Sequence, residues 1–167
     1  MTNRFVGYDN IVPLIAPVAG TTGTLETTYI DLRGAQNASF LVMFGTITST
    51  TAANYLAITV EAAVTEGGAE ALIGFDYRVS GIVGANTWGA ITSVGVAGYV
   101  GAIPALDNNM VWIDLDPATL AANDYRYVRL LATPTDSLDT YVVAVVAIVE
   151  SRYKQTTFVS ATASASA

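Results

Sequence analysis

The sequence predicts an all-β protein, an antiparallel β-sandwich of about eight or nine strands with jelly-roll or Greek-key-like connections. Short segments alternate apolar and polar residues with a period of two, which is the pattern of half-buried strands. Clusters of Gly, Pro, Asn, Asp and Ser separate these segments about every ten residues. No segment keeps a helical period over several turns, so the pattern favours a sandwich over an α/β fold.

We divide the chain into three parts: an extended N-terminal arm of residues 1–24, a β-sandwich domain of residues 25–155, and a C-terminal tail of residues 156–167. Proline or glycine interrupts the arm at positions 13, 17, 20 and 23, although residues 11–16 could add a strand to a sheet edge. The tail is a low-complexity run of small residues, which we expect to be loose.

The first half of the domain predicts four strands, at residues 25–32, 39–45, 56–61 and 72–79. The second of these contains a continuous apolar run from Phe40 to Phe44, which predicts a strand buried on both faces. The third alternates with a period of two, so Leu56, Ile58 and Val60 share one face. The fourth follows a turn at residues 66–68 and places Asp76 and Arg78 on the side opposite its apolar residues.

The second half predicts four further strands, at residues 91–100, 110–115, 125–131 and 140–149. Gly98, inside the first of them, indicates a bulge or a close approach of another backbone segment. Residues 117–122 are the one segment expected to form a helical turn, with Asp116 as its N-cap and Pro117 in the first position.

Composition predicts a structural or binding role without enzymatic activity. The chain contains no His and no Cys, the residues most useful for proton transfer near neutral pH and for metal binding. We therefore expect no catalytic residues, no cofactor and no metal. Only 13% of the residues are charged, against about 25% in an average soluble domain. So few charges predict a surface that copies of the chain or a larger assembly partly cover.

Charge and hydropathy exclude two classes of partner. The net charge of −7 disfavours binding to a nucleic-acid backbone, which requires clustered Lys and Arg. The longest apolar run, residues 141–149, is far shorter than the stretch of about 20 residues that a membrane-spanning helix needs. We expect neither nucleic acid nor a membrane as a partner.

Two sets of carboxylates leave alternatives open. Asp114 and Asp116 share a strand face and could hold Ca²⁺ at the strand end. Alternatively, they are the outward residues of a half-buried strand whose inward residues are Val111, Ile113 and Leu115, with Asp116 doubling as the helix cap. Glu61, Glu66 and Glu70 flank a predicted hairpin turn, either as paired acids for glycoside hydrolysis or as solvated charges. We favour the second interpretation for both sets.

Aromatic and basic residues suggest contacts between subunits. Trp112 shares a face with Asp114, and an outward aromatic residue among acids is typical of an interface. The alternative is a carbohydrate-binding platform formed with Trp88. Four of the seven basic residues lie in the last quarter of the chain: Arg126, Arg129, Arg152 and Lys154. They either form a basic spot for a carboxylate partner or offset nearby acids.

Several short motifs follow one another through the second half: FDYRVSG (75–81), NTWGA (86–90), DNN (107–109), IDLD (113–116), YRYVR (125–129) and VAVVAI (143–148). The first half adds IDLRG (30–34), which leads into an apolar strand. This succession, over about residues 25–154, resembles a group of small virion proteins of tailed bacteriophages. The resemblance implies a capsid decoration or cement protein, without a catalytic signature.

A decoration protein of this kind would stabilise the head by binding between capsomers. The implied partners are the major capsid protein and further copies of the chain, as a homotrimer. The implied location is the outer capsid surface of the virion, after synthesis in the host cytoplasm. The expected interface residues are Ile11, Val12, Pro13 and Leu14 in the arm, and Trp112, Arg126 and Arg129 between subunits.

Two alternatives remain beside this hypothesis. The first is another virion component, a head–tail joining or tail protein. The second is a carbohydrate-binding or receptor-binding β-module that uses Trp88 and Trp112.

Overall fold

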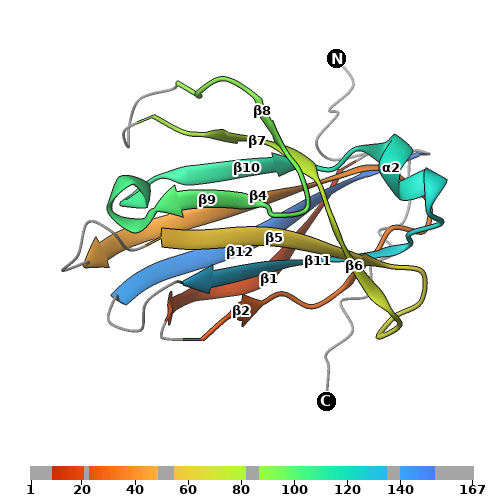
Figure 1. Cartoon of the computed structure of the whole chain (residues 1–167), viewed down its shortest axis with the longest axis horizontal. Coiled ribbons are helices and arrows are strands. Elements are labelled where there is room, and N and C mark those ends of the chain that lie inside the picture. Colours follow the sequence, from red (N-terminus) through yellow and green to blue (C-terminus); the bar gives the residue numbers. More distant parts are fainter. Residues whose placement is uncertain (1–8, 21–22, 49–54, 82–86, 135–139, 153–167) are drawn as a thin grey trace.

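The structure is a computed structural model that describes residues 9–20, 23–48, 55–81, 87–134 and 140–152. Within these segments, twelve strands form two antiparallel sheets that pack face to face (Figure 1). The predicted all-β sandwich is confirmed. In the same segments, none of the helices combines the length and the apolar character needed to cross a membrane.

The larger sheet, called sheet A, has the strand order β1-β12-β4-β10-β7-β8. Its strands are β1 (Asp9–Gly20), β12 (Thr140–Ser151), β4 (Ala35–Thr48), β10 (Met110–Asp114), β7 (Phe75–Val79) and β8 (Thr92–Val94). The other sheet, sheet B, has two long central strands, β11 (Tyr127–Pro134) and β5 (Tyr55–Ala63). Short strands flank them: β2 (Leu25–Glu26) and β3 (Ile30–Asp31) pair with β11, and β6 (Glu70–Ile73) and β9 (Tyr99–Ala102) pair with β5.

The strand order is that of a jelly roll. Strands β2 and β3 count as one broken strand, β6 and β9 count as another, and β7 with β8 forms an insertion. Of the eight strands that remain, sheet A holds the first, eighth, third and sixth, and sheet B holds the second, seventh, fourth and fifth. The sequence left jelly-roll and Greek-key connections open, because pairing between distant segments leaves no local pattern.

The core lies between the two sheets and follows the period-two pattern of the strands. On β5, Leu56, Ile58 and Val60 point inward and are at most 1% exposed. On β10, Val111 and Ile113 do the same from the other sheet. The predicted inward faces of these strands are confirmed, because successive side chains alternate between the core and the outside.

Two segments that the sequence predicts as single strands are divided between the sheets. Gly74 separates β6 in sheet B from β7 in sheet A, and a Cβ atom there would lie 2.6 Å from the carbonyl oxygen of Val94. Residues 91–100 divide into β8 and β9 around a turn that ends at Gly98. Gly98 has a φ of +74° and packs its Cα against the backbone of Ile58, so the expected close approach is confirmed.

The short helix α2 (Pro117–Ala122) closes one end of the sandwich (Figure 1). The Asp116 carboxylate accepts hydrogen bonds from the backbone N–H groups of Ala118 and Thr119 at 3.0 and 3.1 Å. Asp116 is therefore the N-cap that the sequence predicts. The Thr119 hydroxyl, followed by the Ala118 N–H, lowers the pKa of Asp116. A short 3₁₀ helix, η1 (Ile103–Leu106), is not signalled in the sequence.

Residues 9–20 of the expected arm form β1 and do not project from the domain. β1 pairs with β12 along the edge of sheet A, as the sequence allowed for residues 11–16. Val12 and Leu14 pack against the core, whereas Ile11 and Pro13 are exposed. The pairing has a physical cause, because the backbone groups of the apolar strand β12 need hydrogen-bond partners on both sides. Residues 1–8 of the arm, and residues 153–167 with the predicted tail, lie outside the described residues.

Candidate interaction surface

The outer face of sheet A carries aligned rows of side chains. The central row crosses five strands: Pro13 (β1), Val146 (β12), Leu41 (β4), Trp112 (β10) and Arg78 (β7). On one side of it lies a second row: Ala144, Met43 and Met110. On the other side lies a row that begins with Ile11 and Ile148 and continues with Ser39, Asp114 and Asp76. We call the set Ile11, Pro13, Leu41, Met43, Met110, Trp112, Val146 and Ile148 the apolar face.

Continuous apolar runs in the sequence produce this surface. Phe40 and Val42 point into the core and are fully buried, whereas Leu41 and Met43 alternate with them and point outward. The prediction that the run from Phe40 to Phe44 is buried on both faces is therefore wrong for the single chain. In a two-layer sandwich only the inner face of each sheet is covered, and the outward residues Leu41 and Met43 of β4 remain half-buried.

An aromatic cluster stands at one end of the central row. Trp88 pairs across the sheet with Ser80 and meets Trp112 edge to face, with ring centroids 6.3 Å apart at 85°. The guanidinium carbon of Arg78 lies 5.0 Å from the Trp88 ring centre and 5.8 Å from that of Trp112. Both indoles are half-buried. Because Arg78 stacks on both rings, it covers ring surface that a sugar would need for stacking.

Arg78 combines a positive charge with incomplete hydrogen bonding. Its Nε atom is buried and has no hydrogen-bond partner among the residues that the structure describes. The described residues form five ion pairs, and Arg78 takes part in none of them. The cation is held by the two indole rings alone, as far as the described segments show.

A pair of carboxylates lies beside this cluster. Asp76 and Asp114 are directly opposite one another on β7 and β10. Asp114 accepts a hydrogen bond of 2.7 Å from the indole of Trp112 and another from the Ser39 hydroxyl, and Asp76 accepts one from Ser93. All three donors are neutral, so the two charges face each other without a described cation between them.

The same residues test the calcium alternative. Asp114 and Asp116 line one pocket together with Asp76, but Asp114 accepts hydrogen bonds from Trp112 and Ser39, whereas Asp116 caps α2. In the described segments, no three His, Cys, Asp or Glu side chains gather closely enough to hold a metal ion.

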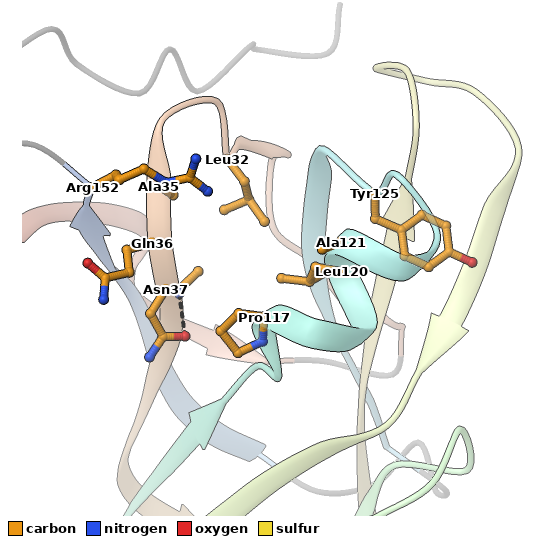
Figure 2. Close-up of a pocket in the computed structure, with 10 residues that line it drawn as sticks. Leu32, Ala35, Gln36, Asn37, Pro117, Leu120, Ala121, Tyr125 and Arg152 are labelled. Carbon is orange, nitrogen blue, oxygen red and sulfur yellow. Dashed lines mark hydrogen bonds between the residues drawn. The ribbon is translucent and has the colours of Figure 1, made fainter.

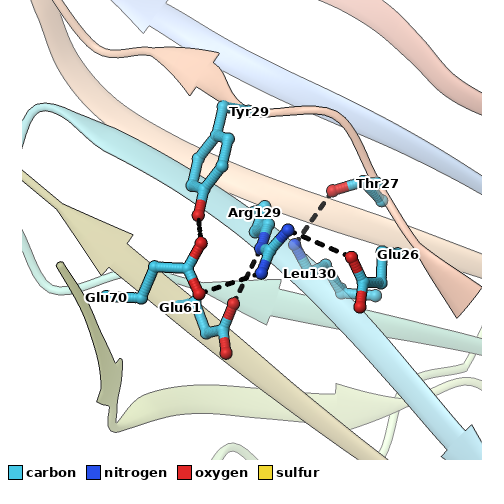
Figure 3. A network of polar contacts seen from close by, with 7 residues as sticks. All are labelled: Glu26, Thr27, Tyr29, Glu61, Glu70, Arg129 and Leu130. Carbon is cyan, nitrogen blue, oxygen red and sulfur yellow. Dashed lines mark hydrogen bonds and ion pairs between the residues drawn. The ribbon is translucent and has the colours of Figure 1, made fainter. Parts of the chain in front are cut away.

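The outer face of sheet B differs, because a charged network occupies it (Figure 3). Arg129 on β11 donates from Nε to Glu61 at 2.7 Å. Its two terminal nitrogens donate to Glu26 and Glu70, each at 3.0 Å, and Tyr29 donates its hydroxyl to Glu70. Glu61 and Glu70 are thus bound by one guanidinium instead of being solvated turn charges, whereas Glu66 is exposed.

Burial and charge act against each other in this network. The Arg129 and Glu61 side chains are only 18% and 16% exposed. Burial of Arg129 works against its charge, but the hydrogen bond and ion pair with Glu61 raise its pKa above the ordinary value. The Tyr29 hydroxyl lowers the pKa of Glu70, with a further contribution from Arg129. The raised pKa of Arg129 and the lowered pKa of Glu70 both favour the charged forms that the ion pair needs.

Arg126 is engaged in a separate pair with Asp31. Its Nε and terminal nitrogen donate to the two carboxylate oxygens of Asp31 at 2.9 and 2.8 Å. Together with the Arg129 network, this pair favours the second interpretation of the basic residues, namely that they offset nearby acids. Arg152 is exposed, and Lys154 lies outside the described residues.

The structure does not bring all predicted interface residues together. Trp112 belongs to sheet A, whereas Arg126 and Arg129 lie at β11 in sheet B. The outward side chains of the two sheets point in opposite directions, so these residues cannot form one continuous contact. Ile11 and Pro13 do join Trp112 on the outer side of sheet A, while Val12 and Leu14 face the core.

A small pocket lies at the end of the sandwich closed by α2 (Figure 2). Its volume is about 180 Å³, and Leu32, Leu120 and Asn37 line it with Arg152 at its rim. The Asn37 side chain accepts a hydrogen bond from the N–H of Ala38, which satisfies its oxygen. The pocket has no cluster of titratable groups, so its lining does not indicate a reaction.

Sequence reasoning missed several members of the apolar face: Leu41, Met43, Met110, Val146 and Ile148. A signal for them was present, because runs without polar residues place apolar side chains on both faces of a strand. Arg78 was assigned to an outward face but was not expected to join Trp88 with Trp112, since residues of separate strands meet only through the sheet pairing.

Comparison of the chain with protein-family models, with curated protein sequences and with solved structures finds no match in any of the three.

Proposed function

We propose that this chain is a structural subunit of a virion, a decoration or cement protein that binds between capsomers on the outer surface of a tailed-phage head. The observation that carries the proposal is the apolar face, which is left half-exposed on an otherwise complete sandwich. Burying apolar surface contributes about 25 cal/mol per Å², so such a face contributes to assembly. The resemblance to small phage virion proteins supplies the assignment to a capsid.

The edge strand β1 is the proposed contact with the major capsid protein. It is the outermost strand of sheet A, and its side away from β12 has no partner strand in the described segments. A free strand edge can pair with an extended segment of another protein. Ile11 and Pro13 expose apolar surface along this strand.

Binding to shells tests the proposal directly. Purified chain is added to capsids that lack it, and bound protein is measured after sedimentation over a range of salt concentrations. We expect saturable binding, with many copies on each shell and a higher temperature of shell disruption. Absence of binding at every salt concentration would overturn the proposal. If only a few copies bind, as a single ring at one vertex, the chain would instead be assigned to the head–tail junction.

A matched pair of variants locates the contact. Val18 on β1 and Leu72 on β6 are 43% and 44% exposed, but they belong to different sheets. Val18→Lys is expected to weaken shell binding, because the lysine would be desolvated in the contact. Leu72→Lys adds the same charge on sheet B and is expected to leave binding unchanged.

A further inference from the structure

We propose that a second copy of this chain covers the apolar face, with the two copies related by a two-fold axis. The inference deepens the proposed function and rests on it only in treating this face as an assembly surface. Its occupant is argued from the charges that the face carries and from its size.

The charged residues Arg78 and Asp76, which lie beside the apolar face, can pair with the same residues of a second copy. Arg78 on β7 has no described ion-pair partner. Asp76, two residues earlier on the same strand, is exposed and faces Asp114, and no described cation lies between these two carboxylates. A two-fold axis that crosses the strands at the level of Tyr77 sets the Arg78 of each copy against the Asp76 of the other. The operation produces two equivalent ion pairs, as an isologous interface requires. It also supplies the cation that the carboxylate pair lacks.

The same operation matches the apolar residues. It places the central row of one copy on the row of the other copy that begins with Ile11 and Ile148. Val146 therefore meets Ile148, and Pro13 meets Ile11. Trp112 then faces Asp114 of the other copy, beside the two ion pairs. Five strands at a spacing of about 4.8 Å make the face about 20 Å wide. A face of this width offers several hundred Å² per copy, which reaches the lower range of specific interfaces.

Other surfaces fit a second copy less well. The outer face of sheet B carries the Arg129 network, whose charges are already paired within one chain. Elsewhere a chain with a net charge of −7 repels its copy. The apolar face is the described surface on which apolar area and unpaired charges of both signs occur together.

The mass of the purified chain in solution is the first test. Light scattering coupled to gel filtration, at micromolar concentration without shells, is expected to report two chains. A mass of one chain at all concentrations, or of three chains, would overturn the proposal. Val146→Lys is expected to raise the dissociation constant by about 30-fold or more, since it places a charge in the apolar centre. Val100→Lys serves as the control and should keep the mass of the unaltered chain.

A charge exchange separates an interface from a folding effect. Arg78→Glu gives a face with acids only, and Asp76→Arg gives a face with both positions basic, so each variant alone is expected to be monomeric. An equimolar mixture should recover a dimer that contains one chain of each kind. Two folded variants that stay monomeric when mixed, or that both remain dimeric alone, would contradict the proposed pairing.

Two further measurements test the dimer separately from the binding to shells. A chain that ends at Arg152 should dimerise as the full chain does. If it dimerises while the full chain does not, residues 153–167 cover the face and the proposal fails. A chain that dimerises as expected but does not bind shells would overturn the proposed function and leave the dimer intact.

Discussion

Trp112 and Asp114, two residues apart on β10, are joined by a hydrogen bond of 2.7 Å from the indole nitrogen to a carboxylate oxygen. The same oxygen accepts a hydrogen bond from the Ser39 hydroxyl on the neighbouring strand β4. The outward side chains of two strands are thereby tied together at the edge of the apolar face. The pair orients the indole, since its nitrogen has a fixed partner.

Replacing the indole of Trp112 with a smaller aromatic ring that has no N–H group should cost stability. Trp112→Phe is expected to lower the free energy of unfolding by about 1–2 kcal/mol, because a hydrogen bond to a charged acceptor is lost. Urea denaturation followed by circular dichroism measures the change. Ser39→Ala, which removes the other donor to the same oxygen, should give a change of similar size. Wild-type stability in both variants would contradict this role of Asp114.

Arg129 is expected to be the most sensitive charged residue of the chain. Arg129→Met leaves Glu26, Glu61 and Glu70 close together without a cation, and should lower the free energy of unfolding by about 2 kcal/mol. Arg33→Met is the matched control, because the Arg33 side chain is 72% exposed in its pair with Asp31. Its expected change is below about 0.5 kcal/mol. Equal effects of the two substitutions in thermal melts would refute this ranking.

Tyr141 should tolerate the loss of its hydroxyl. The side chain is 1% exposed, and burial raises its pKa. In the described part of the chain its hydroxyl oxygen has no hydrogen-bond partner. Tyr141→Phe is expected to leave the free energy of unfolding unchanged or raise it by up to about 1 kcal/mol, because an unsatisfied polar group is removed. Tyr29→Phe provides the contrast, since it deletes a hydroxyl that donates to Glu70. A clear loss of stability in Tyr141→Phe would indicate a partner for the hydroxyl.

Gly98 is required at the start of β9. Gly98→Ala is expected to lower the free energy of unfolding by about 2 kcal/mol or more, since its φ is +74° and a Cβ atom would collide with the Ile58 carbonyl group. Gly95→Ala, three residues earlier in the same turn, is the control because nothing lies within 4 Å of its added Cβ. Its expected change is within about 0.5 kcal/mol. Similar melting temperatures for the two variants would show that the backbone shifts at little cost.

Stability should fall on acidification partly through Asp116. Hydrogen bonds from Thr119 and Ala118 lower its pKa in the folded chain. A lowered folded pKa means that its contribution is present above the unfolded value of about 3.9 and is lost as the pH falls through the folded value. Asp116→Asn keeps an acceptor at the N-cap but does not titrate, so its melting temperature should decline less between pH 5 and about 2. Parallel declines in both proteins would exclude this contribution.

Local sequence pattern predicted much of the fold. The alternation on β5 and β10 identified their inward residues, and the order of Asp116 and Pro117 identified the N-cap of α2. Both succeed because they depend on neighbours a few residues apart. Local pattern did not predict the break in segment 72–79. Its alternation is that of one strand, but the chain passes from sheet B to sheet A at Gly74.

The sequence by itself determined the class of the protein: an antiparallel sandwich with few charges, and with apolar runs that supply more apolar surface than one core can use. Only the tertiary structure decided which apolar side chains lie on the outer faces of the sheets. It placed β1 beside β12, brought Arg78 onto Trp88 and Trp112, and sent Arg129 to the opposite sheet. The physical reason is that cross-strand neighbours are set by hydrogen-bond pairing over long separations in the chain, and the period of two constrains only the face of a strand.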